Sequence, residues 1–285
     1  MLTPRSVGIA VAGAGLLVLG LAAPSLASEG KSAVAAAPKP TAGANAAGIT
    51  GPGQAFMGWH NQTGTTTAKA DQKPASIGTL ATVPGIDVSS HQGNVNWANW
   101  WGQGKRFAYV KATEGTSYRN PYFAQQYNGS YNVGMIRGAY HFALPNVSSG
   151  ATQANYFASN GGGWSGDGKT LPGALDIEYN PYGSTCYGLS QASMVNWIRD
   201  FTTTYKARTG RDAVIYSTTD WWTQCTGNNG SFGATNPLWI ARYSSSPGTL
   251  PADWGFHTFW QYTSTPIDQN YFNGAMDRLQ ALANG

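Results

Sequence analysis

Cysteine is scarce in this chain, which holds only Cys186 and Cys225 among its 285 residues. Two cysteines suffice for one disulfide, which we expect if the chain is exported; two free thiols are the alternative. No histidine lies close to either cysteine in the sequence, so a zinc site is not expected. No apolar run after residue 21 is long enough to cross a membrane. We therefore expect no metal ion, no other cofactor and no membrane anchor.

Charge is scarce as well, since Asp, Glu, Lys and Arg make up 11% of the residues. The formal net charge of +4 arises mostly in residues 1–80, which hold five Lys and Arg but only two acids. The remainder holds twelve basic and eleven acidic residues and is nearly neutral. It has no basic cluster, so a nucleic-acid partner is not expected.

The first 27 residues have the pattern of a signal peptide. Arg5 provides a positive start, Val7–Leu21 is apolar, and Ser25–Ala27 resembles a cleavage site. The apolar stretch is short for a membrane anchor, which is the alternative. We therefore predict a secreted, extracellular protein that is cut after Ala27.

Residues 28–80 are rich in Ala, Gly, Thr and Pro and follow neither a helical nor a strand period. Such a composition cannot bury a core, so we predict a low-complexity leader or linker that is largely disordered. The stretch Gln54–His60 is an exception; it is either a pro-segment that touches the folded domain or an adhesive patch in a linker. The folded domain is expected over residues 81–285, enough for one substantial core.

Short apolar runs bounded by Gly and Pro predict strands along this domain. They fall at 85–88, 107–111, 135–142, 174–179, 213–217, 238–242 and 258–262. Helices are predicted at 120–131, 149–158 and, most clearly, 190–208, where Ser190 can cap the start and Gly210 the end. Little room for helices remains near the C-terminus. The pattern predicts an α/β barrel, similar to a TIM barrel, whose last strands lack full crossover helices.

Asp176 and Glu178 flank Ile177 inside one predicted strand, so their side chains are expected on the same face. Two neighbouring acids raise each other's proton affinity, and glycoside cleavage needs a carboxyl group that stays protonated near neutral pH. A polar network that closes the barrel is the structural alternative for this pair. The spacing therefore indicates either an acid/base site or a buried polar contact.

Three further acids, Asp87, Asp268 and Glu114, lie in or just after predicted strands, where a barrel carries its catalytic groups. The remaining aspartates have polar or turn-like surroundings and are expected at the surface. The many Trp and Tyr residues suit a site that stacks on sugar rings. A Ser-based triad with His91 or His141 is a weaker alternative, because no oxyanion motif accompanies these residues.

Six short motifs occur in order along residues 84–283. They are Gly85-Ile86-Asp87-Val88-Ser89, Lys111-Ala112-Thr113-Glu114-Gly115, Arg137-Gly138-Ala139-Tyr140-His141-Phe142, Leu175-Asp176-Ile177-Glu178, Phe259-Trp260-Gln261-Tyr262 and Asp268-x-Asn270-x-Phe272-Asn273-Gly274. In this order they resemble glycoside hydrolase family 25, the Chalaropsis-type lysozymes. One departure is the run 89–93, which lacks a Trp that family members often carry there.

The resemblance implies a (β/α)5(β)3 barrel of eight strands and about five helices. It implies hydrolysis, without a metal, of the β-1,4 bond between N-acetylmuramic acid and N-acetylglucosamine in bacterial peptidoglycan, by an enzyme that we expect to be a monomer. Glu178 matches the general acid/base, Asp176 its partner carboxylate, and Asp87 and Asp268 further catalytic acids. Substrate-binding residues are expected at Tyr140, Glu114, Trp260, Tyr216 and Arg242.

Two mechanisms fit this set of residues. Asp176 could attack the sugar directly, or the substrate's own 2-acetamido oxygen could attack while Asp176 orients that group. We favour the second, with retention, because the i, i+2 spacing places Asp176 beside Glu178 rather than across the sugar from it. A chitinase-like glycosidase and a non-catalytic wall-binding module are the alternative functions. A disulfide between Cys186 and Cys225 would tether the loop beyond Glu178 to the loop after the strand at 213–217.

Overall fold

The computed structural model describes residues 39–62 and 81–285, which include all of the expected catalytic domain. The predicted signal peptide lies outside these residues, as do residues 28–38 and 63–80 of the predicted leader. Within the described ranges, no helix is both long enough and apolar enough to cross a membrane.

Eight strands close into one barrel. They are β1 (Val83–Val88), β2 (Phe107–Glu114), β4 (Ile136–Phe142), β5 (Ala174–Asp176), β6 (Val214–Ser217), β7 (Leu238–Ala241), β8 (Phe259–Thr263) and β9 (Gln269–Phe272). The pairing of β1 with both β2 and β9 closes the sheet, and a short strand, β3 (Tyr118–Arg119), pairs with the end of β2. The barrel predicted from the sequence is confirmed.

One strand of the barrel runs against the others. The strands β1, β2 and β4 to β8 are parallel, whereas β9 is antiparallel to both of its neighbours. The sequence pattern places Asp268 at the end of a strand, but it immediately precedes β9. Because β9 is reversed, its start lies where the parallel strands end, and the carbonyl of Asp268 accepts the amide of Asp87 at 3.2 Å.

Aromatic side chains fill the barrel interior next to the acids. The rings in contact are Phe107, Tyr109, Trp239 and Phe259, with centroids 4.7 to 5.6 Å apart. Gly85 and Gly138 lie on β1 and β4, the two strands that flank β2 in the barrel, and a Cβ at either position would collide with the ring of Phe107 or Tyr109. Two motif glycines therefore make room for this layer of rings. Gly85 precedes Asp87 by two positions on β1, so the rings pack next to Asp87 on the same face of the strand.

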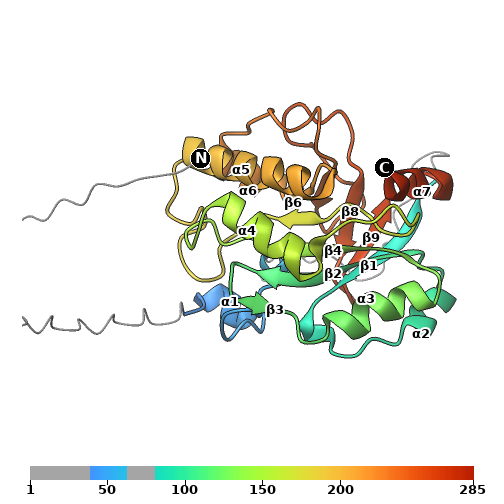
Figure 1. The fold of residues 1–285 in the computed structure, drawn as a ribbon. Coiled ribbons are helices and arrows are strands. Elements are labelled where there is room, and N and C mark those ends of the chain that lie inside the picture. Colours follow the sequence, from blue (N-terminus) through green and yellow to red (C-terminus); the bar gives the residue numbers. More distant parts are fainter. Residues whose placement is uncertain (1–38, 63–80) are drawn as a thin grey trace, which may run out of the picture. The chain divides into compact units, whose positions relative to one another are not determined.

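Helices cover the outside of the barrel (Figure 1). They are α2 (Trp97–Gly102), α3 (Phe123–Asn132), α4 (Gly150–Phe157), α5 (Gln191–Thr209), α6 (Thr219–Thr226) and α7 (Met276–Asn284). As predicted, the Ser190 side chain caps α5 by accepting the amide of Ser193, and Gly210 ends it at φ +76°. No α-helix lies between β7 and β8 or between β8 and β9. The last strands lack crossover helices, as the pattern predicted.

Residues 39–62 form a packed segment, here called the strap, which contains α1 (Ala42–Ala46) and a 3-10 turn at Trp59–Gln62. The sequence predicts disorder for this region apart from Gln54–His60, for which contact with the folded domain is one of two alternatives; in the structure residues 39–62 are packed on the domain. Ile49, Phe56 and Met57 are buried among side chains of the catalytic domain. The contacts of the strap with the domain hold it in place, and such contacts cannot be deduced from the composition of the segment itself. It is the blue segment beside β2 and β3 in Figure 1.

Candidate active site

Asp176 and Glu178 lie together at the end of β5. Asp176 is the last residue of the strand, Glu178 follows two positions later, and both side chains are buried. Ile177 packs with Leu175 in a separate apolar cluster, as alternation along an extended chain requires. The i, i+2 spacing therefore directs two carboxyl groups to the same side of the backbone.

Burial is the main cause of the raised pKa values of this pair. It raises the pKa of Glu178 to about 8, and it raises the pKa of Asp176 well above its ordinary value, with the charge of Glu178 adding to the effect. The amide of Gly58 donates to Oε1 of Glu178 across 2.6 Å and lowers that pKa, and the charge of Lys111 lowers the pKa of Asp176. The site therefore holds a carboxyl group that is protonated at neutral pH.

Asp87 is held by two side-chain amides. Its Oδ2 accepts hydrogen bonds from Asn270 at 2.7 Å and from Gln261 at 3.0 Å. Burial raises the pKa of Asp87 to about 7, and the two hydrogen bonds limit the rise. Asn270 in turn accepts a hydrogen bond from Nε1 of Trp239 at 2.9 Å, which fixes the orientation of its amide. Strands β1, β8 and β9 thus meet at one buried carboxyl group.

Asp268 joins this network through Tyr243. The Tyr243 hydroxyl lies 3.4 Å from Oδ1 of Asp268 and 3.2 Å from Oε1 of Gln261, and Tyr216 donates to the same Gln261 oxygen across 2.6 Å. Burial raises the pKa of Asp268 well above its ordinary value, and the charge of Asp87 adds to the rise. Asp87 and Asp268 are therefore linked through charge and through Tyr243 and Gln261, which contact each other between the two carboxyl groups.

Lys111 and Glu114 form a buried ion pair beside the acids, with Nζ 2.6 Å from Oε2. The other oxygen of Glu114 accepts hydrogen bonds from the Tyr182 hydroxyl at 2.6 Å and from the amide of Gly53 at 2.8 Å. Burial lowers the pKa of Lys111, and the neighbouring Glu114 opposes this effect. The pair thus places a positive charge close enough to favour the ionised form of Asp176.

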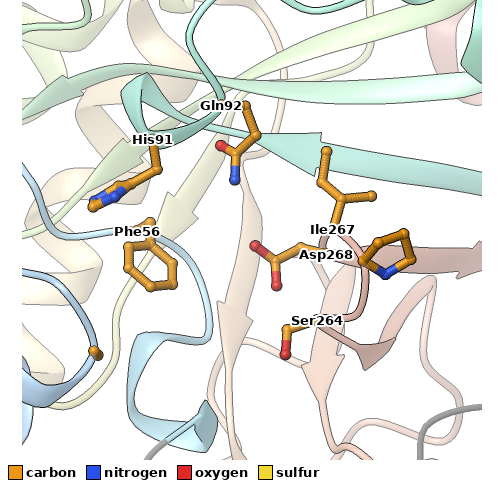
Figure 2. A pocket seen from close by; sticks show the side chains of 8 residues that line it. Phe56, His91, Gln92, Ser264, Ile267 and Asp268 are labelled. Atoms are coloured by element: carbon orange, nitrogen blue, oxygen red, sulfur yellow. The ribbon is translucent and has the colours of Figure 1, made fainter.

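A pocket of 240 Å³ adjoins Asp268 (Figure 2). Its walls come from Phe56 of the strap, from His91 and Gln92 after β1, and from the hairpin between β8 and β9. Figure 2 shows the Asp268 carboxyl group directed into this space. Among the described residues, no group of three or more His, Cys, Asp and Glu side chains could hold a metal ion.

The arrangement is suited to acid/base chemistry on a sugar. One carboxyl group that is protonated at neutral pH can donate a proton to a leaving oxygen, and a second beside it can act on the positive charge that develops. A family model described as glycosyl hydrolases family 25 matches residues 86–271. The chain belongs to glycosyl hydrolase family 25. The resemblance drawn from the six motifs is confirmed, and the protein is a glycoside hydrolase.

Close relatives of this family 25 enzyme carry the names of lysozymes and muramidases. Lysozyme M1 of Streptomyces globisporus is 50% identical over 247 residues, which cover 82% of this chain and 83% of that protein. The N,O-diacetylmuramidase of a Chalaropsis species is 50% identical and covers 72% of this chain and 100% of its own length. The solved muramidase of Acremonium alcalophilum is 63% identical, covers 71% of this chain and 99% of its own, and has a TM-score of 0.71.

The structure brings only part of the expected substrate-binding set to the acids of the family 25 enzyme. Tyr140, Tyr216 and Glu114 are buried beside them. Trp260 alternates with Phe259 and Gln261, so it faces away from the interior, and its indole donates to the carbonyl of Arg242 at 2.9 Å. The exposed guanidinium of Arg242 lies 3.4 Å from Ser246 rather than at the acids.

The two histidines considered for a triad have other partners. The ring of His141 lies between Thr113 and Gln153, at 2.8 and 2.9 Å, and is fully buried. The Nε2 of His91 lies 2.6 Å from the carbonyl oxygen of Gln54 in the strap. These contacts give the triad alternative no support.

The predicted disulfide between Cys186 and Cys225 is present. It joins the loop beyond Glu178 to α6, which follows β6. Four residues that contact the acids were not singled out from the sequence. Gln261, Asn270 and Lys111 stand inside quoted motifs, which is the signal that could have found them. Tyr243 lies in the loop after β7 and carries no such signal.

Proposed function

We propose that this family 25 glycoside hydrolase cleaves the β-1,4 bond between N-acetylmuramic acid and N-acetylglucosamine in bacterial peptidoglycan. The observation that carries the proposal is the buried pair of Asp176 and Glu178 at the end of β5, in which Glu178 has a pKa of about 8. The relatives named lysozyme and muramidase, at about half sequence identity over most of the chain, support this substrate.

Glu178 is the proton donor in this proposal. Its proton passes to the glycosidic oxygen as the bond from that oxygen to the anomeric carbon breaks. The substrate's 2-acetamido oxygen forms a bond to the anomeric carbon from the opposite face, and Asp176 stabilises the positive charge on the acetamido group. Water then attacks the anomeric carbon as the bond from that carbon to the acetamido oxygen breaks, which restores the acetamido group, and Glu178 takes up the water's proton. The configuration is retained because inversion occurs twice.

The proposed location is outside the cell, after removal of residues 1–27, and the active form is a monomer. N-terminal sequencing of protein secreted by the source cell tests the cleavage site, and sedimentation equilibrium tests the monomer. A first residue inside 1–27 contradicts the proposed processing.

The reducing-end sugar left after digestion of purified cell walls tests the reaction. Borohydride reduction followed by acid hydrolysis identifies it. A reduced muramic acid supports the proposal, and a reduced glucosamine overturns it in favour of the opposite bond. Cleavage of chitin oligomers in place of cell walls would indicate a chitinase-like enzyme. If digestion produces no new reducing ends from either substrate, only a wall-binding role remains.

A further inference from the structure

The strap occupies the catalytic end of the barrel through its backbone. The amide of Gly58 donates to Oε1 of Glu178 at 2.6 Å, and the amide of Gly53 donates to Oε1 of Glu114 at 2.8 Å. Lys111 donates to the carbonyl oxygens of both Gly53 and Ala55. Amide and carbonyl groups of the strap therefore use polar partners that a glycan would need.

Side chains of the strap fill the same region. Met57 is fully buried and packs in one cluster with Tyr140, Tyr216 and Trp239 of the barrel interior. Trp59 is 2% exposed and donates its indole N–H to the carbonyl of Tyr179 at 3.0 Å. A sugar ring cannot enter the space that these two side chains hold.

Gly58 fits its place so closely that no other residue would. Its φ is +78°, and a Cβ there would lie 2.5 Å from Oε1 of Gln261 and from the hydroxyl of Tyr243. Backbone in the left-handed region with no space for a side chain requires glycine. The contact with Glu178 thus depends on this one residue of the strap.

The strap is not part of the barrel itself. Residues 81–285 make up 72% of the chain, and the muramidase of Acremonium alcalophilum matches 71% of this chain with 99% of its own length. The matched share is close to the size of residues 81–285, so a match of about barrel length accounts for nearly all of that solved chain. The match to Lysozyme M1 covers 82% of this chain, so it extends to residues that precede the barrel.

We propose that the strap is an autoinhibitory pro-segment, which binds the active site as a peptide ligand and excludes peptidoglycan until it is removed. This inference rests on the proposed role of the acids in glycan cleavage. The strap competes with the substrate for space at Tyr140 and Tyr216. It also holds Glu178 through an N–H donor, which favours the carboxylate over the form that can give a proton. A glycan strand that enters the pocket beside Asp268 would meet Phe56 of the strap in its wall.

The first test compares glycan cleavage by the full-length chain and by the same chain cut at a protease site engineered within residues 63–80, after removal of the freed strap. We expect the intact chain to be at least about tenfold less active, since a tethered ligand acts at millimolar effective concentration. Gly58→Val in the uncut chain should restore activity by unseating the strap. Gly43→Ala is the matched control, because a Cβ at this strap position meets nothing within 4 Å; it should leave the intact chain inhibited.

A second readout does not depend on catalysis. A synthetic peptide of residues 39–62 is titrated into the cut, strap-free chain by calorimetry, beside the same peptide with Gly58→Val. We expect the native peptide to bind, the altered peptide to bind at least about tenfold more weakly, and soluble peptidoglycan oligosaccharides to compete with the native peptide. Failure of the native peptide to bind overturns the inference, as does equal activity of intact and cut chains. If the cut chain binds the peptide but cleaves no wall, the proposed function fails and the strap remains a ligand of this site.

Discussion

Asn270 and Gln261 donate hydrogen bonds to the same oxygen of Asp87, at 2.7 and 3.0 Å. The two amides come from β9 and β8 and reach a carboxyl group on β1, so the point where the barrel closes is also a part of its candidate active site. Asp87 would otherwise be buried without donors, which costs more than leaving it in water. The closure of the sheet and the placement of this acid therefore depend on each other.

The first prediction concerns Asn270→Leu. The change removes the closer donor to Asp87 and leaves the indole N–H of Trp239 without its acceptor. We expect the pKa of Asp87 to rise further and the free energy of unfolding to fall by about 1–3 kcal/mol. Urea denaturation at pH 7 measures the loss. A stability equal to that of the parent chain would show that these hydrogen bonds have no net effect.

The second prediction concerns Glu178→Gln in the strap-free domain, residues 81–285. Glutamine keeps the size and loses the transferable proton, so the turnover number on cell walls should fall by about 10²–10⁴-fold, the usual contribution of a general acid. Loss of turbidity of a wall suspension gives the rate, and circular dichroism checks the fold. Near-normal lysis would reject Glu178 as the proton donor.

Asp176 requires a separate experiment. We expect Asp176→Asn to lower the turnover number. In the parent enzyme we expect no covalent bond between Asp176 and the sugar, because the acetamido group is the nucleophile in the proposed mechanism. Mass spectrometry of the domain after reaction with a 5-fluoro glycosyl fluoride that keeps its 2-acetamido group is the measurement. A sugar bonded to Asp176 would replace the substrate-assisted mechanism by direct attack.

The third prediction concerns the stability of the full-length chain as a function of pH. Burial raises the folded-state pKa of Glu178 from 4.5 to about 8 and that of Asp87 from 3.8 to about 7. Between these limits the folded chain keeps protons that the unfolded chain releases, so stability falls as pH rises. We expect Tm to fall between pH 5 and pH 8, and to fall less in the double variant Asp87→Asn/Glu178→Gln. Equal slopes in the two chains would contradict the raised values.

The fourth prediction compares Tyr216→Phe with Trp260→Phe in the strap-free domain. The Tyr216 hydroxyl orients Gln261 beside Asp87, so its loss should lower kcat/KM by about tenfold, the effect of one hydrogen bond. Trp260 faces away from the interior, so its replacement should lower Tm and leave kcat/KM nearly unchanged. Steady-state kinetics and thermal unfolding of both variants are the measurements. A lower kcat/KM for Trp260→Phe with a nearly unchanged value for Tyr216→Phe would support Trp260 as a substrate-binding residue.

The fifth prediction concerns the disulfide. Cys186 and Cys225 are separated by 39 positions, so the bond restrains a long loop in the unfolded chain. We expect Cys186→Ser/Cys225→Ser to lower the free energy of unfolding by about 2–4 kcal/mol. Urea denaturation measures it, and dithiothreitol should lower the stability of the parent chain but not that of the variant.

The sequence predicted the elements whose own residues carry the pattern. Helix α5 has a capping serine, a buried stripe and a terminal glycine, and it starts and ends within one residue of the prediction. The strands with apolar runs were found, whereas β3 and β9 were not. β3 has only two residues, and β9 has only four, of which every second one is buried, so both carry little hydrophobic signal. The prediction for β5 was too long, since the chain leaves the ladder after Asp176.

The site was harder to predict where it depends on contacts between distant segments. Trp260 was placed in the site because it stands in a motif, but strand alternation turns it outward beside Gln261. Tyr243 and the part of the strap before Gln54 were missed for a related reason. A loop tyrosine and a glycine-rich segment have no periodicity, and the strap contacts Glu178, Glu114 and Lys111 through backbone amides and carbonyls, which sequence patterns do not distinguish. Whether such a segment binds depends on the polar groups of the barrel that it contacts, not on a pattern in its own residues.

The reversed direction of β9 has a consequence for how this enzyme can diversify. Asp268 reaches the site from a short hairpin after β8, so no crossover helix is tied to that wall. Insertions and deletions in a hairpin leave the strands in register, whereas changes in a crossover would shift packed helices. Insertions, deletions or substitutions of a few residues around Ser264 and Ile267 can therefore change the length or the charge of this wall, while the acids on the parallel strands stay in place.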